Sequence, residues 1–175
     1  MRQARSVCWM SGGSGADVVH AFKYSGWSAL AEPMADQLAR VNGVVDSKLK
    51  NALVPVPLAR ARERERGYNQ SALLASALAR RWRIPAWNAA LERTRYTQTQ
   101  TALTPQQRLT NVADAFSIMA AFRARVRNAH LILVDDVITT GATMNACAAA
   151  MFAAGARSVA YLTFGRARAP GDAPT

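Results

Sequence analysis

The chain has 175 residues, 50% of them apolar, and a formal charge of +11 at neutral pH. This length suits one main domain. The apolar residues form short runs, far from the roughly 20 that a membrane helix needs, and the basic amino end lacks the apolar core of a secretory signal. The composition therefore argues against membrane insertion and predicts a cytoplasmic protein. Its charge comes mostly from arginine, which suits bidentate contact with phosphate or carboxylate, so we expect an anionic partner.

The two cysteines give no sign of a metal centre. Cys8 and Cys147 lie far apart in the sequence, form no Cys-x-x-Cys pair and have no histidine at metal spacing. We expect both to be reduced thiols.

Taken in chain order, residues 16–39 have the apolar spacing of one or two helices. Ser25 and Gly26 mark a break, and Pro33 falls in the first turns of the second piece. A polar connection follows, and residues 52–56 then predict a short buried strand that ends at Pro57.

Residues 58–67 form a loop or a helical turn with arginine at every second position. These arginines alternate with small and acidic residues and are Arg60, Arg62, Arg64 and Arg66. Three interpretations stay open here: a solvated charged segment, contact with a pyrophosphate group, and contact with nucleic acid.

The middle of the chain contains the clearest helix. Residues 69–81 are amphipathic, and Asn69 is available as the N-terminal cap. A strand is expected over residues 86–91 and another over 115–119. Between them, residues 93–105 are polar and too long for a tight turn, which predicts a mobile loop, and residues 106–112 predict a short helix.

The last third alternates strand, helix and strand. Residues 130–134 are an unbroken apolar run of strand length, and residues 135–143 are expected to form a loop. Thr143 then caps a helix of small residues that ends before Gly155, and residues 158–164 make a last strand. Strands alternating with helices, several of them apolar throughout, predict an α/β fold with a mostly parallel sheet covered on both faces.

One segment carries the strongest functional signal: Leu131-Ile-Leu-Val-Asp135-Asp136-Val-Ile-Thr139-Thr140-Gly141-Ala142-Thr143. Ligands of open α/β sheets bind outside the carboxyl ends of strands. Small residues followed by a helix start favour binding of a 5′-phosphate. The two carboxylates can accept hydrogen bonds from ribose hydroxyls and attract Mg²⁺. The plainer alternative is that Asp135 and Asp136 are only turn and capping residues.

This segment resembles the phosphoribosyl pyrophosphate signature of type I phosphoribosyltransferases. Further segments together resemble the ComF family, whose members are associated with DNA uptake in competence. They are Val54-Pro-Val-Pro-Leu58, Arg64-Glu-Arg-Gly-Tyr-Asn-Gln70, residues 93–100, Arg108, Asn111-Val112 and Ala115-Phe116. The resemblance covers about residues 18–166.

The resemblance implies a role for each matching residue. Asp135 and Asp136 would contact the ribose hydroxyls and, through ligand or water, a Mg²⁺ ion. The 5′-phosphate would be wrapped by Thr139, Thr140, Gly141, Ala142 and Thr143. Pro57 and Arg60 would lie in the pyrophosphate loop, and Arg95, in a lid that closes over the substrate, is a candidate for the pyrophosphate.

The resemblance also implies a domain plan. Residues 1–43 would form a helical hood that chooses the base, residues 44–166 the type I phosphoribosyltransferase core, and residues 167–175 a disordered tail. Many ComF proteins begin with a four-cysteine zinc ribbon, of which this chain retains only Cys8. Purine-specific relatives have an acidic residue at the position of Thr139, so the acceptor base stays open.

Two functions follow as expectations. In the first, the protein uses Mg²⁺ to transfer a phosphoribosyl group from phosphoribosyl pyrophosphate to a nitrogenous base, releasing pyrophosphate. In the second, it is a ComF-type competence accessory that binds single-stranded DNA or the uptake machinery and uses the nucleotide site as a sensor. Whether two copies form a homodimer is left open.

Overall fold

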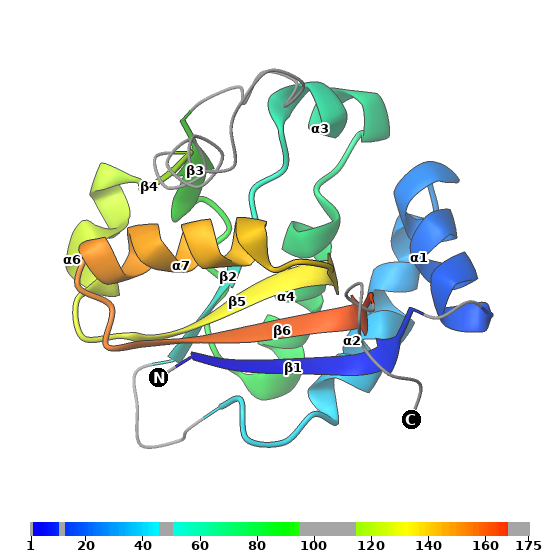
Figure 1. Ribbon diagram of the computed structural model, residues 1–175, viewed down its shortest axis with the longest axis horizontal. Coiled ribbons are helices and arrows are strands. Elements are labelled where there is room, and N and C mark those ends of the chain that lie inside the picture. The colour runs from blue at the N-terminus through cyan, green and yellow to red at the C-terminus, as the bar shows by residue number, and fades with distance from the viewer. Residues whose placement is uncertain (1, 11–12, 46–50, 95–114, 168–175) are drawn as a thin grey trace.

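A parallel four-stranded sheet forms the centre of the computed structural model, which describes residues 2–10, 13–45, 51–94 and 115–167 (Figure 1). The strands lie in the order β1-β6-β5-β2, and all three pairings are parallel. Their bounds are Arg2–Trp9 for β1, Ser158–Arg166 for β6, His130–Ile138 for β5 and Asn51–Pro55 for β2. The expected α/β class with a mostly parallel sheet is confirmed.

Helices cover both faces of this sheet (Figure 1). On one face α7 (Ala142–Ala153) packs against Leu131 and Leu133 of β5. On the other, α1 (Ser14–Tyr24), α2 (Ala31–Ala39) and α4 (Gln70–Trp82) pack against Ile132 and Val134. Successive side chains of a strand point to opposite faces, so a strand segment buried on both sides is apolar throughout, as residues 131–134 of β5 are.

The edge strand β1 was not predicted, because residues 1–43 were expected to be a helical hood. Its sequence, Arg2-Gln-Ala-Arg-Ser-Val-Cys-Trp9, has no regular alternation of polar and apolar residues that would predict a strand, and the strand forms through its parallel pairing with β6. Ser6 Oγ and Thr163 Oγ1 share a hydrogen bond of 2.7 Å between the two strands. The first residues of the chain therefore extend the core sheet, and the helices begin only at Ser14.

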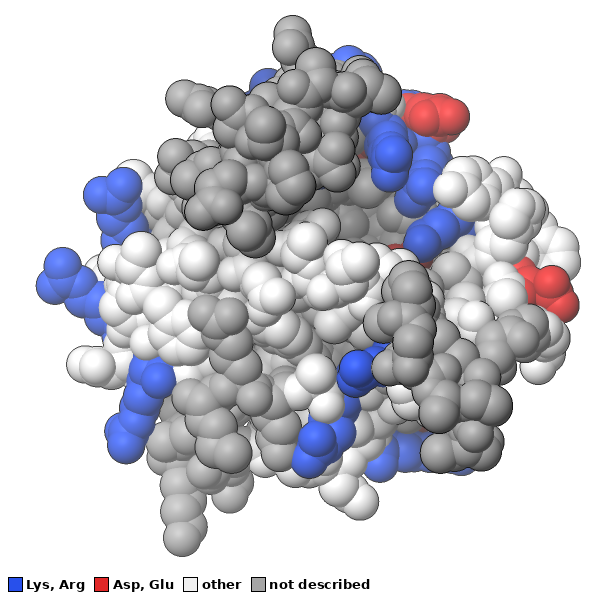
Figure 2. Space-filling model, viewed as in Figure 1, with Lys and Arg blue, Asp and Glu red and all other residues white. Residues whose placement is uncertain are grey.

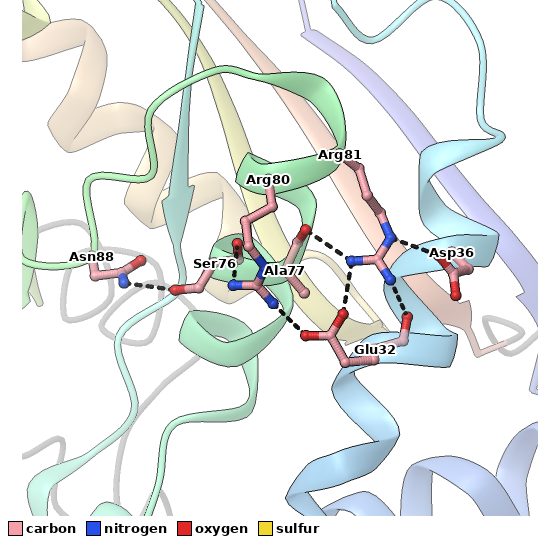
Figure 3. A network of polar contacts seen from close by, with 7 residues as sticks. All are labelled: Glu32, Asp36, Ser76, Ala77, Arg80, Arg81 and Asn88. Atoms are coloured by element: carbon pink, nitrogen blue, oxygen red, sulfur yellow. Dashed lines mark hydrogen bonds and ion pairs between the residues drawn. The ribbon is translucent and has the colours of Figure 1, made fainter.

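The helical part of this amino-terminal region agrees with the prediction. After α1, a break at Ser25 and Gly26 leads through a short 3-10 helix, η1 (Ser28–Leu30), into α2, where Pro33 lies in the first turn. Helix α2 is attached to α4 through Arg81, whose guanidinium lies between two acidic side chains of α2 (Figure 3). It contacts Glu32 Oε2 at 3.0 Å and Asp36 Oδ1 at 2.6 Å. Arg80 also contacts Glu32.

Several smaller predictions need correction. Residues 60–66 are a helix, α3 (Arg60–Arg66), ended by Gly67 in the left-handed conformation. The strand expected over residues 86–91 is reduced to an isolated bridge between Leu53 and Ala86. Beyond it lies a two-stranded antiparallel sheet, whose second strand confirms the strand expected over residues 115–119. Two short helical pieces follow. These elements are β3 (Leu91–Arg93), β4 (Phe116–Ile118), η3 (Ala120–Phe122) and α6 (Arg123–Val126).

Some expectations lie outside the described residues. They concern most of the loop over 93–105, with Arg95, the helix over 106–112, and nearly all of the tail over 167–175. Within the described part of the chain, no helix has both the length and the apolar character that a membrane span requires.

Candidate functional site

The acid pair lies inside a strand, not in a loop as predicted. Strand β5 continues past Val134 to Ile138, and Asp135 pairs with Thr163 of β6. The extension occurs because β6 itself runs to Arg166 and offers pairing partners up to that residue. The backbone of the acid pair is therefore held within the paired part of β5, at the carboxyl edge of the sheet.

Asp135 is held from α4. Ser71 Oγ donates a hydrogen bond of 2.7 Å to Asp135 Oδ1, and the backbone N–H of Asp136 donates to the same oxygen at 2.9 Å. Burial raises the pKa of Asp135 to about 7, and the neighbouring charge of Asp136 adds to this rise. The Ser71 hydrogen bond and the Lys23 charge oppose it. Asp135 is thus poised to change charge near neutral pH.

Asp136 is held from α1. Only 5% of the residue is exposed, and its Oδ1 accepts a hydrogen bond of 2.8 Å from the backbone N–H of Val137. Its Oδ2 is buried and accepts no hydrogen bond within the described part of the chain, but it lies 2.9 Å from Lys23 Nζ as an ion pair. A cation already faces this carboxylate, which shows that the position accommodates positive charge.

The loop after β5 forms a small hollow beside Asp135. Its volume is about 60 Å³, and its lining consists of Asp135 and residues 137–144. Gly141 takes the left-handed conformation, with φ 75°, and is the N-cap of α7. Glycine adopts this backbone conformation without strain, which suits it to this position. Since α7 begins at Ala142, Thr143 lies in the first turn of the helix and is not the cap that the sequence predicts.

The start of α7 suits an anion. The N-cap residue of α7 makes no side-chain hydrogen bond to the helix. Among the described residues, one side chain contacts the first N–H groups of α7: Thr140 Oγ1 accepts a long hydrogen bond of 3.4 Å from the backbone N–H of Ala142. The first N–H groups of a helix and its dipole attract negative charge. Asp135 and Asp136 bond to other partners and do not cap α7, which disfavours the interpretation of the pair as mere capping residues.

The loop after β2 lies at the same edge of the sheet, because β2 and β5 are parallel neighbours. Pro57 there is half-buried, and the exposed Arg60 begins α3. Neither residue lines the hollow beside Asp135. The structure thus brings the acid pair together with residues 139–143, and it places Pro57 and Arg60 on the adjacent loop.

The segment from Tyr68 to Ser71 joins three parts of the site, which the sequence did not reveal. The Tyr68 hydroxyl donates to the carbonyl of Phe22 in α1 at 2.5 Å. Asn69 caps α4, as predicted, and also donates to the carbonyl of Val56 after β2 at 3.1 Å. Ser71 then holds Asp135. This segment therefore positions α1, the loop after β2 and the acid pair relative to one another.

Lys23 and Ser71 were not among the predicted site residues. A lysine near the end of a helix and a serine after a cap are ordinary in sequence, and only the fold shows that both reach the acid pair. A larger hollow of about 380 Å³ lies along the second half of α7, near Phe116, Arg123 and Arg127. It does not include the acid pair, so we place the functional site at the strand tips.

The described residues contain no group of three or more His, Cys, Asp or Glu side chains that could hold a metal ion. Asp135 and Asp136 provide carboxylate oxygens, which Mg²⁺ prefers, but Mg²⁺ needs about six oxygen ligands. The pair fits a cation whose other ligands come from a bound phosphate compound and water.

Comparison with known proteins gives several relatives, although no protein-family model matches the chain. Competence protein F of Haemophilus influenzae is 43% identical over 98 residues, which are 56% of this chain and 42% of that protein. DNA utilization protein YhgH of Escherichia coli is 33% identical over 147 residues, 81% of this chain and 63% of the relative. Competence protein ComFC of Bacillus subtilis is 28% identical over 164 residues, 93% of this chain and 64% of the relative.

The chain thus spans less than two thirds of the length of each of these relatives. Among solved structures, it is similar to glutamine phosphoribosylpyrophosphate amidotransferase from Bacillus subtilis, complexed with ADP and GMP. The TM-score is 0.50 at 22% identity, and the match covers 75% of this chain and 25% of that one. At this identity the likeness shows the fold alone.

Proposed function

We propose that this chain, which belongs to the ComF family and has the type I phosphoribosyltransferase fold, binds phosphoribosyl pyrophosphate with Mg²⁺. It would then transfer the phosphoribosyl group to a nitrogenous base. The observation that carries the proposal is the continuous site in which Asp135 and Asp136 lead into the hollow at the start of α7. It offers sugar-binding carboxylates and a phosphate-binding helix start side by side.

In this proposal the 5′-phosphate lies in the hollow lined by residues 139–143 and accepts hydrogen bonds from their N–H groups. The ribose hydroxyls donate to Asp135 and Asp136. Because Ser71 and Lys23 already hold these carboxylates, little reorganisation accompanies binding. The ribose C1 carbon is then fixed in front of the strand tips.

The reaction is a substitution at C1 of the ribose. The bond from C1 to the pyrophosphate oxygen breaks as a bond from C1 to a base nitrogen forms, and the proton of that nitrogen passes to water. Positive charge develops on the sugar, and negative charge grows on the leaving pyrophosphate. Arg60 and Arg95 are the candidates to stabilise the leaving group, and the acid pair lies beside the developing positive charge.

Asp135 and Asp136 would hold Mg²⁺ through the bound ligand and water. The ion supplies charge neutralisation of the leaving group when it is bound. Burial raises the pKa of Asp135 to about 7, so this carboxylate changes its charge near neutral pH. Ligand binding should therefore strengthen as Asp135 ionises.

Release of pyrophosphate tests the transferase directly. Purified protein is incubated with phosphoribosyl pyrophosphate, Mg²⁺ and a panel of purine and pyrimidine bases, beside the Asp135→Asn, Asp136→Asn double variant. Base-dependent release that the double variant loses supports the proposal. Binding of phosphoribosyl pyrophosphate without release for any base would leave a ligand site and refute the transferase.

A second candidate is a DNA-utilisation accessory in which the ligand site acts as a sensor. It is supported by the names of the relatives, a DNA utilization protein and two competence proteins, and by the exposed arginines of α3. Salt-sensitive binding of single-stranded DNA that survives the double substitution at the acid pair would favour it, because those changes leave the basic surface intact. Absence of DNA binding at low salt would refute it.

A further inference from the structure

We propose that single-stranded nucleic acid binds at the carboxyl edge of the sheet by stacking bases on two exposed aromatic rings, Trp9 and Tyr24, each backed by an arginine. The proposal rests on the second candidate function and names the surface that would perform it. Four observations carry it: exposure, arginine contact, placement and charge.

The first observation is that large aromatic rings are left in solvent. Trp9 is 50% exposed, Tyr24 64% and Trp27 61%. Single exposed apolar residues are common, but these three belong to only two short segments, the end of β1 and the connection from the end of α1 to η1. Aromatic rings that gather in this way are typical of binding surfaces.

The second observation is that two of these rings have a guanidinium over them. Arg166 lies 5.3 Å from the ring centroid of Trp9, and Arg66 lies 4.9 Å from that of Tyr24. Such cation–π contacts hold both groups in place. The rings stay largely exposed, so a base can still reach them, and the arginines remain close enough to contact a phosphate.

The third observation is that both ring–arginine pairs lie at the edge of the sheet that carries the acid pair. Strand β6 lies between β1 and β5, and its residue Arg166 pairs with Trp9 of β1 on one side and with Ile138 of β5 on the other. Trp9 is therefore level with Ile138, which comes two positions after Asp136. Tyr24 directly follows Lys23, whose Nζ contacts Asp136. The two rings therefore lie at the same edge of the sheet as the candidate site.

Tyr24 is also held in position from three directions. Its ring lies 5.0 Å from the His20 ring, between centroids. The two residues before it are fixed, Phe22 through its carbonyl to Tyr68 and Lys23 through Asp136. A ring that is already fixed loses little entropy when a base stacks on it.

The fourth observation is charge. The chain carries +11, and Arg66 belongs to α3, whose other arginines are exposed. Figure 2 shows basic side chains gathered over α3 and in the space between α3 and α1. Stacking rings combined with a basic path for the backbone are the features by which proteins bind single strands without strong sequence preference. A duplex hides its base faces and could use only the charge.

Fluorescence anisotropy with a labelled oligothymidylate tests the proposal. Trp9→Ala and Tyr24→Ala should each weaken binding at least about fivefold, the loss expected for one stacked base. Met119→Ala, which truncates an exposed apolar side chain elsewhere, and Arg123→Gln, which removes an exposed charge elsewhere, are matched controls and should change binding less than about twofold. Circular dichroism of each variant confirms that it folds.

The outcomes separate this surface from the function on which it rests. If the wild type binds no oligothymidylate at low salt, the DNA role fails and the surface fails with it. If the wild type binds and both ring variants bind equally well, the surface alone is wrong. The proposal would also be overturned if the protein bound duplex as tightly as oligothymidylate and if Arg123→Gln weakened binding as much as the two ring variants do. Such binding would be general charge attraction.

Discussion

Replacing Asp135 by asparagine should stabilise the protein above neutral pH while it damages the site. Burial raises the pKa of Asp135 to about 7, against about 3.9 for an ordinary aspartate, and each pKa unit corresponds to about 1.4 kcal/mol. Ionising this side chain in the folded protein therefore costs on the order of 4 kcal/mol. Asparagine has the same shape, still accepts the Ser71 hydrogen bond and never ionises.

The sign of the pH dependence follows from proton binding. Between about pH 4 and pH 7 the folded protein retains the Asp135 proton and the unfolded chain loses it, so the free energy of unfolding falls as pH rises through this window. Asp135→Asn should thus gain roughly 2 to 4 kcal/mol at about pH 8 and change little at about pH 4.

Urea unfolding followed by circular dichroism at both pH values measures this gain. The exposed Asp17 provides a control, since Asp17→Asn should change stability by less than about 1 kcal/mol at either pH. If Asp135→Asn is no more stable than the wild type at about pH 8, the carboxylate is not buried at a cost, and the reasoning on the charge state of the site is refuted.

Three further predictions test the loop, the support of the acid pair and the core. Gly141→Ala should lower the free energy of unfolding by roughly 1 to 2 kcal/mol, because alanine is strained at φ 75°, and it should weaken phosphoribosyl pyrophosphate binding in calorimetry. The control Gly155→Ala, at φ 91° beyond the far end of α7, should lose stability and keep its affinity. Ser71→Ala removes a hydrogen bond that lowers the pKa of Asp135. Because ligand binding should strengthen as Asp135 ionises, the pH of half-maximal ligand binding should move upward in this variant. Ser76→Ala, on the same helix, should leave that pH unchanged. Burial raises the pKa of the Cys147 thiol, and iodoacetamide should label it only after unfolding, as mass spectrometry will show; labelling of Cys147 in the native protein would contradict its burial.

Local patterns in the sequence were enough for much of the fold. The Asn69 cap with its amphipathic helix, the apolar run at residues 131–134 and the helix of small residues before Gly155 are signals within a few neighbouring residues, and each corresponds to a structural element. The ligand roles of Asp135, Asp136 and residues 139–143 stay predictions.

What the sequence could not provide depends on contacts between distant residues. Ser71 and Asp135 are 64 positions apart, and nothing near either residue indicates the other. The same holds for Lys23 and Asp136, and for β1, whose polar residues read as a strand only when β6 lies beside them. The sequence predicts a loop from Asp135 onward, where the apolar run ends. Aspartate is uncommon in strands, and pairing with β6 overrides that preference.

Calorimetric titration with phosphoribosyl pyrophosphate and Mg²⁺ tests the central claim most directly. The wild type should bind in the micromolar range, and the Asp135→Asn, Asp136→Asn double variant should lose binding while it remains folded by circular dichroism. Absence of binding by the wild type, or equal binding by the double variant, would contradict a sugar-phosphate site at the end of β5.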